Sequence, residues 1–166
     1  MPAGRETYSD DCIVDADDLD HGRNVANIPG GNILVCPDEM FAEGSVVFDR
    51  PTPYMGKWVG RIRLDFKDGV LANYRARQNA GHFKAGYEKA SGEKNRIAAI
   101  GVGLNPKARA GFLQDGITAG AVTVAIGGND DIGGASKTDF YFPGVLTKAT
   151  LTIDGNAIVQ NGKLAM

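Results

Sequence analysis

The chain has 166 residues, of which 43% are hydrophobic and 23% are charged, with a formal net charge of −2. These values are typical of one soluble globular domain, and the acidic balance gives no support for binding to nucleic acid. No apolar run approaches the ~20 residues of a membrane helix and no charged-then-apolar leader opens the chain, so we expect a cytoplasmic protein.

Residues 1–25 form an acidic segment, in which the stretch 9-SDDCIVDADDLDHG-22 carries six aspartates. A calcium-binding EF-hand loop needs oxygen ligands at its first, third and fifth positions and glycine at its sixth. Counted from Asp15, the fifth position is Leu19 and the sixth is Asp20, so the pattern fails. We predict a solvated acidic turn that leads into the first strand.

Alternating apolar residues predict a β-hairpin over residues 60–77, with its turn at residues 67–69. Four arginines fall on its polar face: Arg61, Arg63, Arg75 and Arg77. The period then changes, because Phe83, Tyr87 and Ala90 share one stripe of a helix expected over residues 79–92. Asn79 is expected to cap this helix and Gly92 to end it.

The remaining pattern is that of strands. Further strands are expected at residues 32–37, 44–49, 97–103, 121–127 and 148–153, and a turn at 154–155 leads into a hairpin-like ending over 156–164. The 23 glycines favour tight turns over a helical bundle. We therefore predict a strand-rich α+β fold, with a single domain over residues 1–166 and one principal helix.

Five stretches together resemble a known family. They are 22-GRNVANIPGGNILVCPDE-39, 97-IAAIGVGLNPKARA-110, 120-GAVTVAIGGN-129, 133-GGASKTDFYF-142 and 154-DGNAIVQNGKL-164. In this order they resemble motifs of the C-terminal, metal-carrying region of M29 metallo-aminopeptidases of the aminopeptidase T type. The resemblance implies the fold of that region, without the preceding domain of the longer family members.

The resemblance also implies that the metal site has been lost. The family holds two divalent metals with two glutamates, two histidines and an aspartate. The corresponding positions are Asn32, Ala99, Thr123, Asp139 and Tyr141. Of these only Asp139 could still donate a carboxylate, and the histidines of this chain, His21 and His82, lie outside these motifs. A two-metal hydrolase needs several anionic or imidazole ligands, so we expect no metal, no other cofactor and no M29 peptidase activity.

Asp139 and Tyr141 are candidate catalytic residues. They flank Phe140, so on an extended segment their side chains would share one face. They could form an acid–base pair in the former metal cavity, with Asp139 partly desolvated, or a hydrogen-bonded pair that fills the vacated space. Asp130 is a further candidate acid, although solvated loop acids are the simpler interpretation of Asp130 and Asp131.

Other chemistry has little support in the sequence. Cys12 and Cys36 are expected to be buried, reduced thiols, because two cysteines make no disulfide framework. His82 is expected at the surface. A serine nucleophile elbow and a phosphate-binding loop are both missing.

Three functions remain open. The favoured hypothesis is a metal-independent enzyme that catalyses a proton-transfer reaction on a small molecule, such as isomerisation, elimination, cyclisation or hydration. The alternatives are a non-catalytic ligand-binding or assembly protein and a residual metallo-aminopeptidase. Polar, glycine-rich loops around the site favour the first over an apolar filler. Apolar surface left uncovered by a missing domain predicts a homo-oligomer, most simply a dimer, with no nucleic acid or membrane as partner.

Overall fold

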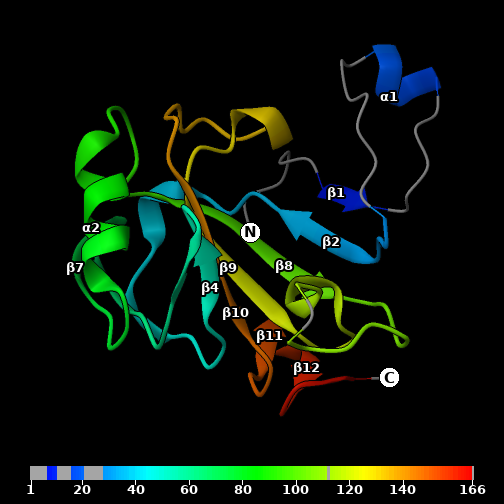
Figure 1. The fold of residues 1–166 in the computed structure, drawn as a ribbon. Coiled ribbons are helices and arrows are strands. Elements are labelled where there is room, and N and C mark those ends of the chain that lie inside the picture. Colours follow the sequence, from blue (N-terminus) through cyan, green and yellow to red (C-terminus); the bar gives the residue numbers. More distant parts are fainter. Residues whose placement is uncertain (1–6, 11–15, 21–27, 112, 166) are drawn as a thin grey trace.

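A computed structural model describes residues 7–10, 16–20, 28–111 and 113–165, and its main layer is a five-stranded antiparallel sheet (Figure 1). The strand order is β1-β2-β8-β9-β10. The strands are β1 (Thr7–Asp10), β2 (Asn32–Val35), β8 (Ile97–Gly103), β9 (Val122–Gly127) and β10 (Tyr141–Leu146). Three of them, β8, β9 and β10, include residues of the motifs at 97–110, 120–129 and 133–142, and the sheet places these strands side by side.

A second layer covers one half of this sheet. It consists of a sheet ordered β3-β6-β7, the hairpin β4–β5 and the helix α2 (Figure 1). The elements are β3 (Gly44–Val47), β4 (Thr52–Tyr54), β5 (Lys57–Val59), β6 (Arg63–Lys67), β7 (Val70–Arg75) and α2 (Ala80–Lys89). Phe83 of α2 is fully buried and joins the layers, because its ring lies 4.8 Å from that of Tyr74 on β7 and 4.9 Å from that of Phe142 on β10.

The chain ends in a small sheet of three strands, β11 (Leu151–Ile153), β12 (Asn156–Gln160) and β13 (Lys163–Leu164). Tight turns connect its strands and those of the other hairpins. In the loops Asp68-Gly69, Asp154-Gly155 and Asn161-Gly162 both residues have positive φ. This is the type I′ geometry that asparagine, aspartate and glycine adopt most easily, which explains why these dipeptides end the strands.

The strand-rich fold with one principal helix is confirmed. The hairpin expected over residues 60–77 is present as β6 and β7, with its turn at Asp68-Gly69, and the hairpin-like ending expected over residues 156–164 is present as β12 and β13. Asn79 occupies the N-cap position of α2 but makes no side-chain cap bond, because its amide donates to the Trp58 carbonyl instead. The helix ends at Lys89, before Gly92. Gly92 lies in the following turn at φ +74°.

Several elements were missed from the sequence. The acidic segment contains β1 and the short helix α1 (Ala16–Asp20), whereas only a turn was expected there. The hairpin β4–β5 and strand β10 were not predicted either, and three one-turn 3-10 helices lie at Glu39–Phe41, Asp115–Ile117 and Asp130–Ile132. Cys12 and His21 lie outside the described residues. None of the helices in the described part of the chain is long and apolar enough to span a membrane.

Candidate functional site

A cavity of about 290 Å³ lies on one face of the main sheet. Its floor includes Asn32 of β2, Thr123 of β9 and Tyr141 of β10, three of the five positions at which the resemblance places metal ligands. Its lining residues are Asn32, Leu34, Pro51, Thr52, Pro53, Leu113, Asp115, Gly116, Thr123, Tyr141, Pro143 and Val145. Residues far apart in the sequence therefore meet where the resemblance located a site.

Strand β8 makes room for this cavity. Gly101 of β8 is registered with Leu34 of β2 on one side and with Thr123 of β9 on the other. Alternation places Ala99, Gly101 and Gly103 on the face of the cavity and the larger Ile100 and Val102 on the opposite face. A Cβ atom at Gly101 would lie 2.6 Å from the Leu34 side chain. The small residues of β8 thus leave room for the side chains of Leu34 and Thr123 on the neighbouring strands.

The cavity presents neutral hydrogen-bonding groups. The Asn32 Oδ1 atom is buried and has no hydrogen-bond partner among the described residues. Thr123 is only 5% exposed. Burial of the phenol, then the nearby charge of Asp131 and the Cys36 thiol, raise the pKa of Tyr141 to about 12, although the residue as a whole is 40% exposed. Tyr141 therefore keeps its proton at neutral pH and can donate a hydrogen bond.

Sequence reasoning missed the acid of this cavity, Asp115. Its Oδ1 atom accepts bonds from Arg50 Nε at 3.2 Å and from the Gly111 amide at 2.7 Å. This ion pair ties the segment after β3 to the loop between β8 and β9, so it holds two walls of the cavity together. The pattern 114-QDGIT-118 gave no signal, because a single loop aspartate is usually solvated.

The structure does not bring Asp139 into the cavity with Tyr141. Asp139 is exposed, which corrects the expectation that its carboxylate is partly desolvated. The charge of Asp139 acts on Tyr54 instead, because the pKa of Tyr54 is raised first by burial and second by the Asp139 carboxylate. Strand β10 begins only at Tyr141, so the alternation that predicted a shared face does not extend back to Asp139. The other candidate acid, Asp130, is also exposed and does not line the cavity.

The remaining predicted residues do not line the cavity. Ala99 is fully buried and packs with Ala98 and Ala125 beside the cavity. Cys36 is buried, as expected, and its thiol donates to the Ile132 carbonyl. His82 is exposed, as expected.

The glycine-rich loop over residues 127–136 wraps a buried asparagine. Asn129 is fully buried, and its amide donates to Glu39 Oε1 and to the Ala98 carbonyl, both at 3.0 Å. Its Oδ1 atom accepts from the Ser136 amide at 2.8 Å. A Cβ atom at Gly134 would clash with the Asn129 side chain. The loop thus needs its glycines for close packing around a structural polar network.

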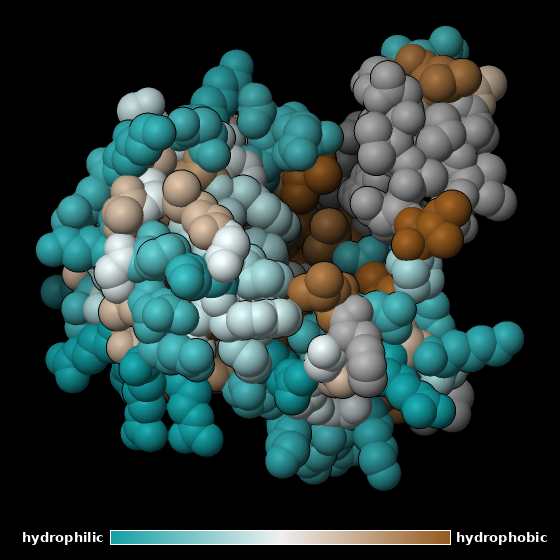
Figure 2. Space-filling view, viewed as in Figure 1, coloured by the Kyte–Doolittle hydropathy of each residue, from teal (hydrophilic) through white to brown (hydrophobic). Residues whose placement is uncertain are grey.

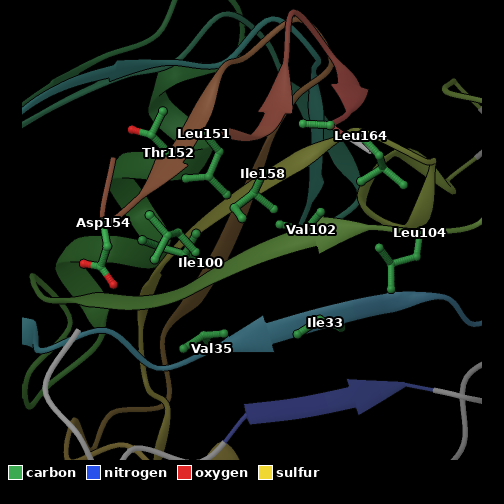
Figure 3. A pocket seen from close by; sticks show the side chains of 12 residues that line it. Ile33, Val35, Ile100, Val102, Leu104, Leu151, Thr152, Asp154, Ile158 and Leu164 are labelled. Atoms are coloured by element: carbon green, nitrogen blue, oxygen red, sulfur yellow. The ribbon is translucent and has the colours of Figure 1, made fainter. Parts of the chain in front are cut away.

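A second, apolar cavity of about 600 Å³ lies on the opposite face of the main sheet. Side chains of Leu151 and Ile158 point from β11 and β12 toward Ile100 and Val102 of β8 (Figure 3). We call this cavity the apolar groove; its lining is Ile33, Val35, Ile100, Val102, Leu104, Leu151, Thr152, Ile153, Asp154, Ile158, Leu164 and Ala165. Apolar residues also gather around β2 and β8 on the face shown in Figure 2.

Comparison with known proteins shows what the chain is similar to. Residues 14–94 match the sequence model of the thermophilic metalloproteases of type M29. AmpT from Thermus thermophilus shares the fold, with a TM-score of 0.63, 16% sequence identity and coverage of 85% of this chain. The chain therefore resembles the M29 metalloproteases over residues 14–94 and shares the fold of AmpT, and we call it the M29-like domain.

A further structure similar to the M29-like domain is 2,5-dihydroxypyridine dioxygenase from Pseudomonas putida KT2440. It matches with a TM-score of 0.66 and 24% identity over 81% of this chain. A comparison with curated protein sequences finds no significant match. The match covers 43% of the dioxygenase chain and 41% of the AmpT chain, so the domain spans less than two thirds of the length of either protein.

The side chains of the M29-like domain do not fit the two-metal site of the family. An amide, a methyl group and a hydroxyl stand at Asn32, Ala99 and Thr123, and a phenol stands at Tyr141. Asp115 is the one carboxylate of the cavity lining, and an arginine already binds it. Within the described ranges no group of three or more His, Cys, Asp and Glu side chains could hold a metal ion. Neutral oxygens supply neither the charge nor the softness that divalent transition metals require.

Proposed function

We propose that the M29-like domain binds a small polar organic molecule in the cavity of Asn32, Thr123 and Tyr141, without the metals of the family. The observation that carries this proposal is the buried Asn32 Oδ1 atom, an acceptor with no partner in the described structure. An unsatisfied buried acceptor costs about 1–3 kcal/mol, so a ligand that donates a hydrogen bond there would recover that energy.

The cavity has the general character of a ligand site. Its volume of about 290 Å³ suits a molecule of metabolite size. Proline, leucine and valine side chains form much of its wall, and a few polar groups converge in it, as in most small-molecule pockets. Asn32 would accept from the ligand, Tyr141 would donate to it, and Thr123 could do either.

The experiment that tests binding uses a variant that fills the cavity. Gly116 lines the cavity, and a Cβ atom there lies 3.2 Å from Thr123 Oγ1, so the side chain of Gly116→Leu would occupy the space. Native mass spectrometry of the domain after incubation with a cell metabolite extract should show a bound organic molecule on the wild type and none on Gly116→Leu. The exposed Gly81→Ala variant, which has open space around its Cβ atom, is the matched control and should keep the ligand. Equal binding by all three proteins would contradict the proposal.

A second candidate function is proton-transfer catalysis in the same cavity. The observation that favours it is that Asp115, a carboxylate, lines the cavity together with the protonated phenol of Tyr141. Asp115 could accept a proton while Tyr141 stabilises a developing oxyanion. This arrangement replaces the pair of Asp139 and Tyr141 expected from the sequence.

Exchange with solvent separates catalysis from binding. If the domain moves a proton of its ligand, the ligand identified above should gain deuterium from D₂O, and Tyr141→Phe should slow this exchange by about 100- to 10,000-fold. A ligand that binds to the wild type but gains no deuterium would leave the domain as a binding protein.

A further inference from the structure

Four arginines line one groove on the outer face of the sheet β3-β6-β7. The groove has a volume of about 440 Å³, and its lining is Val47, Arg61, Arg63, Arg75, Ala76 and Arg77. Arg63 of β6 stands directly opposite Arg75 of β7. The bridge between Gly60 and Gln78 continues the same register, so Arg61 and Arg77 are opposed one step further along. We call this site the arginine groove.

The charges of the arginine groove are largely uncompensated. Arg63 Nε donates to Asp65 Oδ1 at 2.7 Å, and its Nη2 atom donates to Ser45 Oγ at 2.7 Å. In the part of the chain that the structure describes, Arg61, Arg75 and Arg77 have no carboxylate within ion-pair distance. Like charges directly opposite one another across two strands are destabilising. This concentration of positive charge also stands out in a chain whose net charge is −2.

The backbone of the arginine groove is strained at one of these arginines. Arg61 has φ +48°, in the left-handed region that non-glycine residues seldom adopt. Such strain persists only where the surroundings fix it, and it clusters at ligand sites. Two unfavourable features, opposed arginines and a strained backbone, thus coincide in one concave site.

We propose that the arginine groove binds a ligand that carries two or more phosphate groups. Each guanidinium is planar and can donate two parallel hydrogen bonds to two oxygens of a phosphate group. Several guanidinium groups in one groove offer more hydrogen-bond donors than a single carboxylate could accept. Single-stranded nucleic acid is the poorer fit, because the lining contains no aromatic side chain on which a base could stack. The site is separate from the cavity of Asn32 and does not depend on the proposed function.

Calorimetric titration of the intact chain with inorganic pyrophosphate, at low ionic strength, tests this proposal. The wild type should bind, and the double variant Arg75→Gln/Arg77→Gln should bind at least about tenfold more weakly, since it loses charge-assisted hydrogen bonds. Arg75→Lys/Arg77→Lys should fall between them, because lysine keeps the charge but not the fork. The matched control is Arg109→Gln, an exposed arginine outside the groove, which should bind like the wild type.

A second binding experiment distinguishes a lipid headgroup from a soluble phosphate compound as the ligand. Phosphatidylcholine vesicles that contain phosphatidylinositol bisphosphate replace pyrophosphate in one arm, and arginine-dependent binding there would support a lipid headgroup as the ligand. The glutamine double variant should melt no lower than the wild type, because it relieves repulsion between opposed arginines. Three results would overturn the proposal: no binding of either probe, equal binding by wild type and double variant, or arginine-dependent binding of single-stranded RNA alone.

Discussion

Two glycines of helix α2 should respond in opposite ways to alanine. Gly81 lies near the start of the helix with open space around its Cβ position, so Gly81→Ala should stabilise the fold by about 0.5–1 kcal/mol through reduced backbone entropy. A Cβ atom at Gly86 would clash with the Tyr54 hydroxyl and lie 2.7–2.8 Å from Cε1 and Cζ of that ring.

The Tyr54 ring cannot easily move away from Gly86. It packs edge-on against Phe140 at 5.9 Å and against Phe142 at 5.5 Å, and both of these phenylalanines are buried. Overpacking of this kind costs about 1–3 kcal/mol, which exceeds the gain in helix propensity. We therefore expect Gly86→Ala to lower the free energy of unfolding by about 1–2 kcal/mol net.

Urea unfolding followed by circular dichroism measures both changes, and thermal melting checks them. For a domain of this size each kcal/mol corresponds to about 2–4 °C, so Gly81→Ala should melt slightly higher and Gly86→Ala clearly lower than the wild type. If Gly86→Ala were as stable as Gly81→Ala, the packing of α2 against the β4–β5 hairpin described above would be wrong.

Three further predictions concern charge, metal and assembly. Because the pKa of Tyr141 is raised from 10.0 to about 12 in the folded chain, the unfolded chain loses this proton first, and the free energy of unfolding should fall as pH rises between these values. Urea unfolding at several pH values should show a smaller fall for Tyr141→Phe, and an equal fall would contradict the raised pKa. Elemental analysis of the purified domain should find no stoichiometric zinc, cobalt, manganese or iron, and a chelator should leave the melting temperature unchanged; metal that is lost together with stability would refute this. We still predict a homodimer, in which a second copy of the chain would cover the apolar groove. Light scattering should then give a mass of about twice 17.5 kDa, whereas the mass of a monomer would count against the prediction.

Much of the fold could be predicted from local patterns. The alternation of Leu64 and Phe66 with polar residues, ended by Asp68-Gly69, contains all that a hairpin needs, because both the buried face and the turn are local. Strand β10 escaped prediction because Pro143 and Gly144 lie inside it, and both residues disfavour strands in isolation. A Cβ atom at Gly144 would clash with the Phe48 ring, so tertiary packing explains the glycine there.

The candidate site could be predicted only in part. The motifs located Asn32, Thr123 and Tyr141, and the structure places these three in one cavity. Asp139 was paired with Tyr141 by an argument from strand alternation that needs a continuous strand from residue 139, and strand β10 starts only at Tyr141, two residues later. Asp115 could not be found, because its importance arises from Arg50, which lies 65 positions away in the chain.

We have proposed that the cavity of Asn32, Thr123 and Tyr141 binds a small molecule without metal. The most direct measurement is an NMR titration of the labelled domain with the molecule identified by mass spectrometry, in the presence of a chelator. Binding in the cavity should shift the NMR signals of the Asn32 side-chain amide and of the Leu34 and Val145 methyl groups, which line it. Shifts confined to Ile33, Ile100 and Val102 on the opposite face, or shifts that appear only after metal is added, would contradict it.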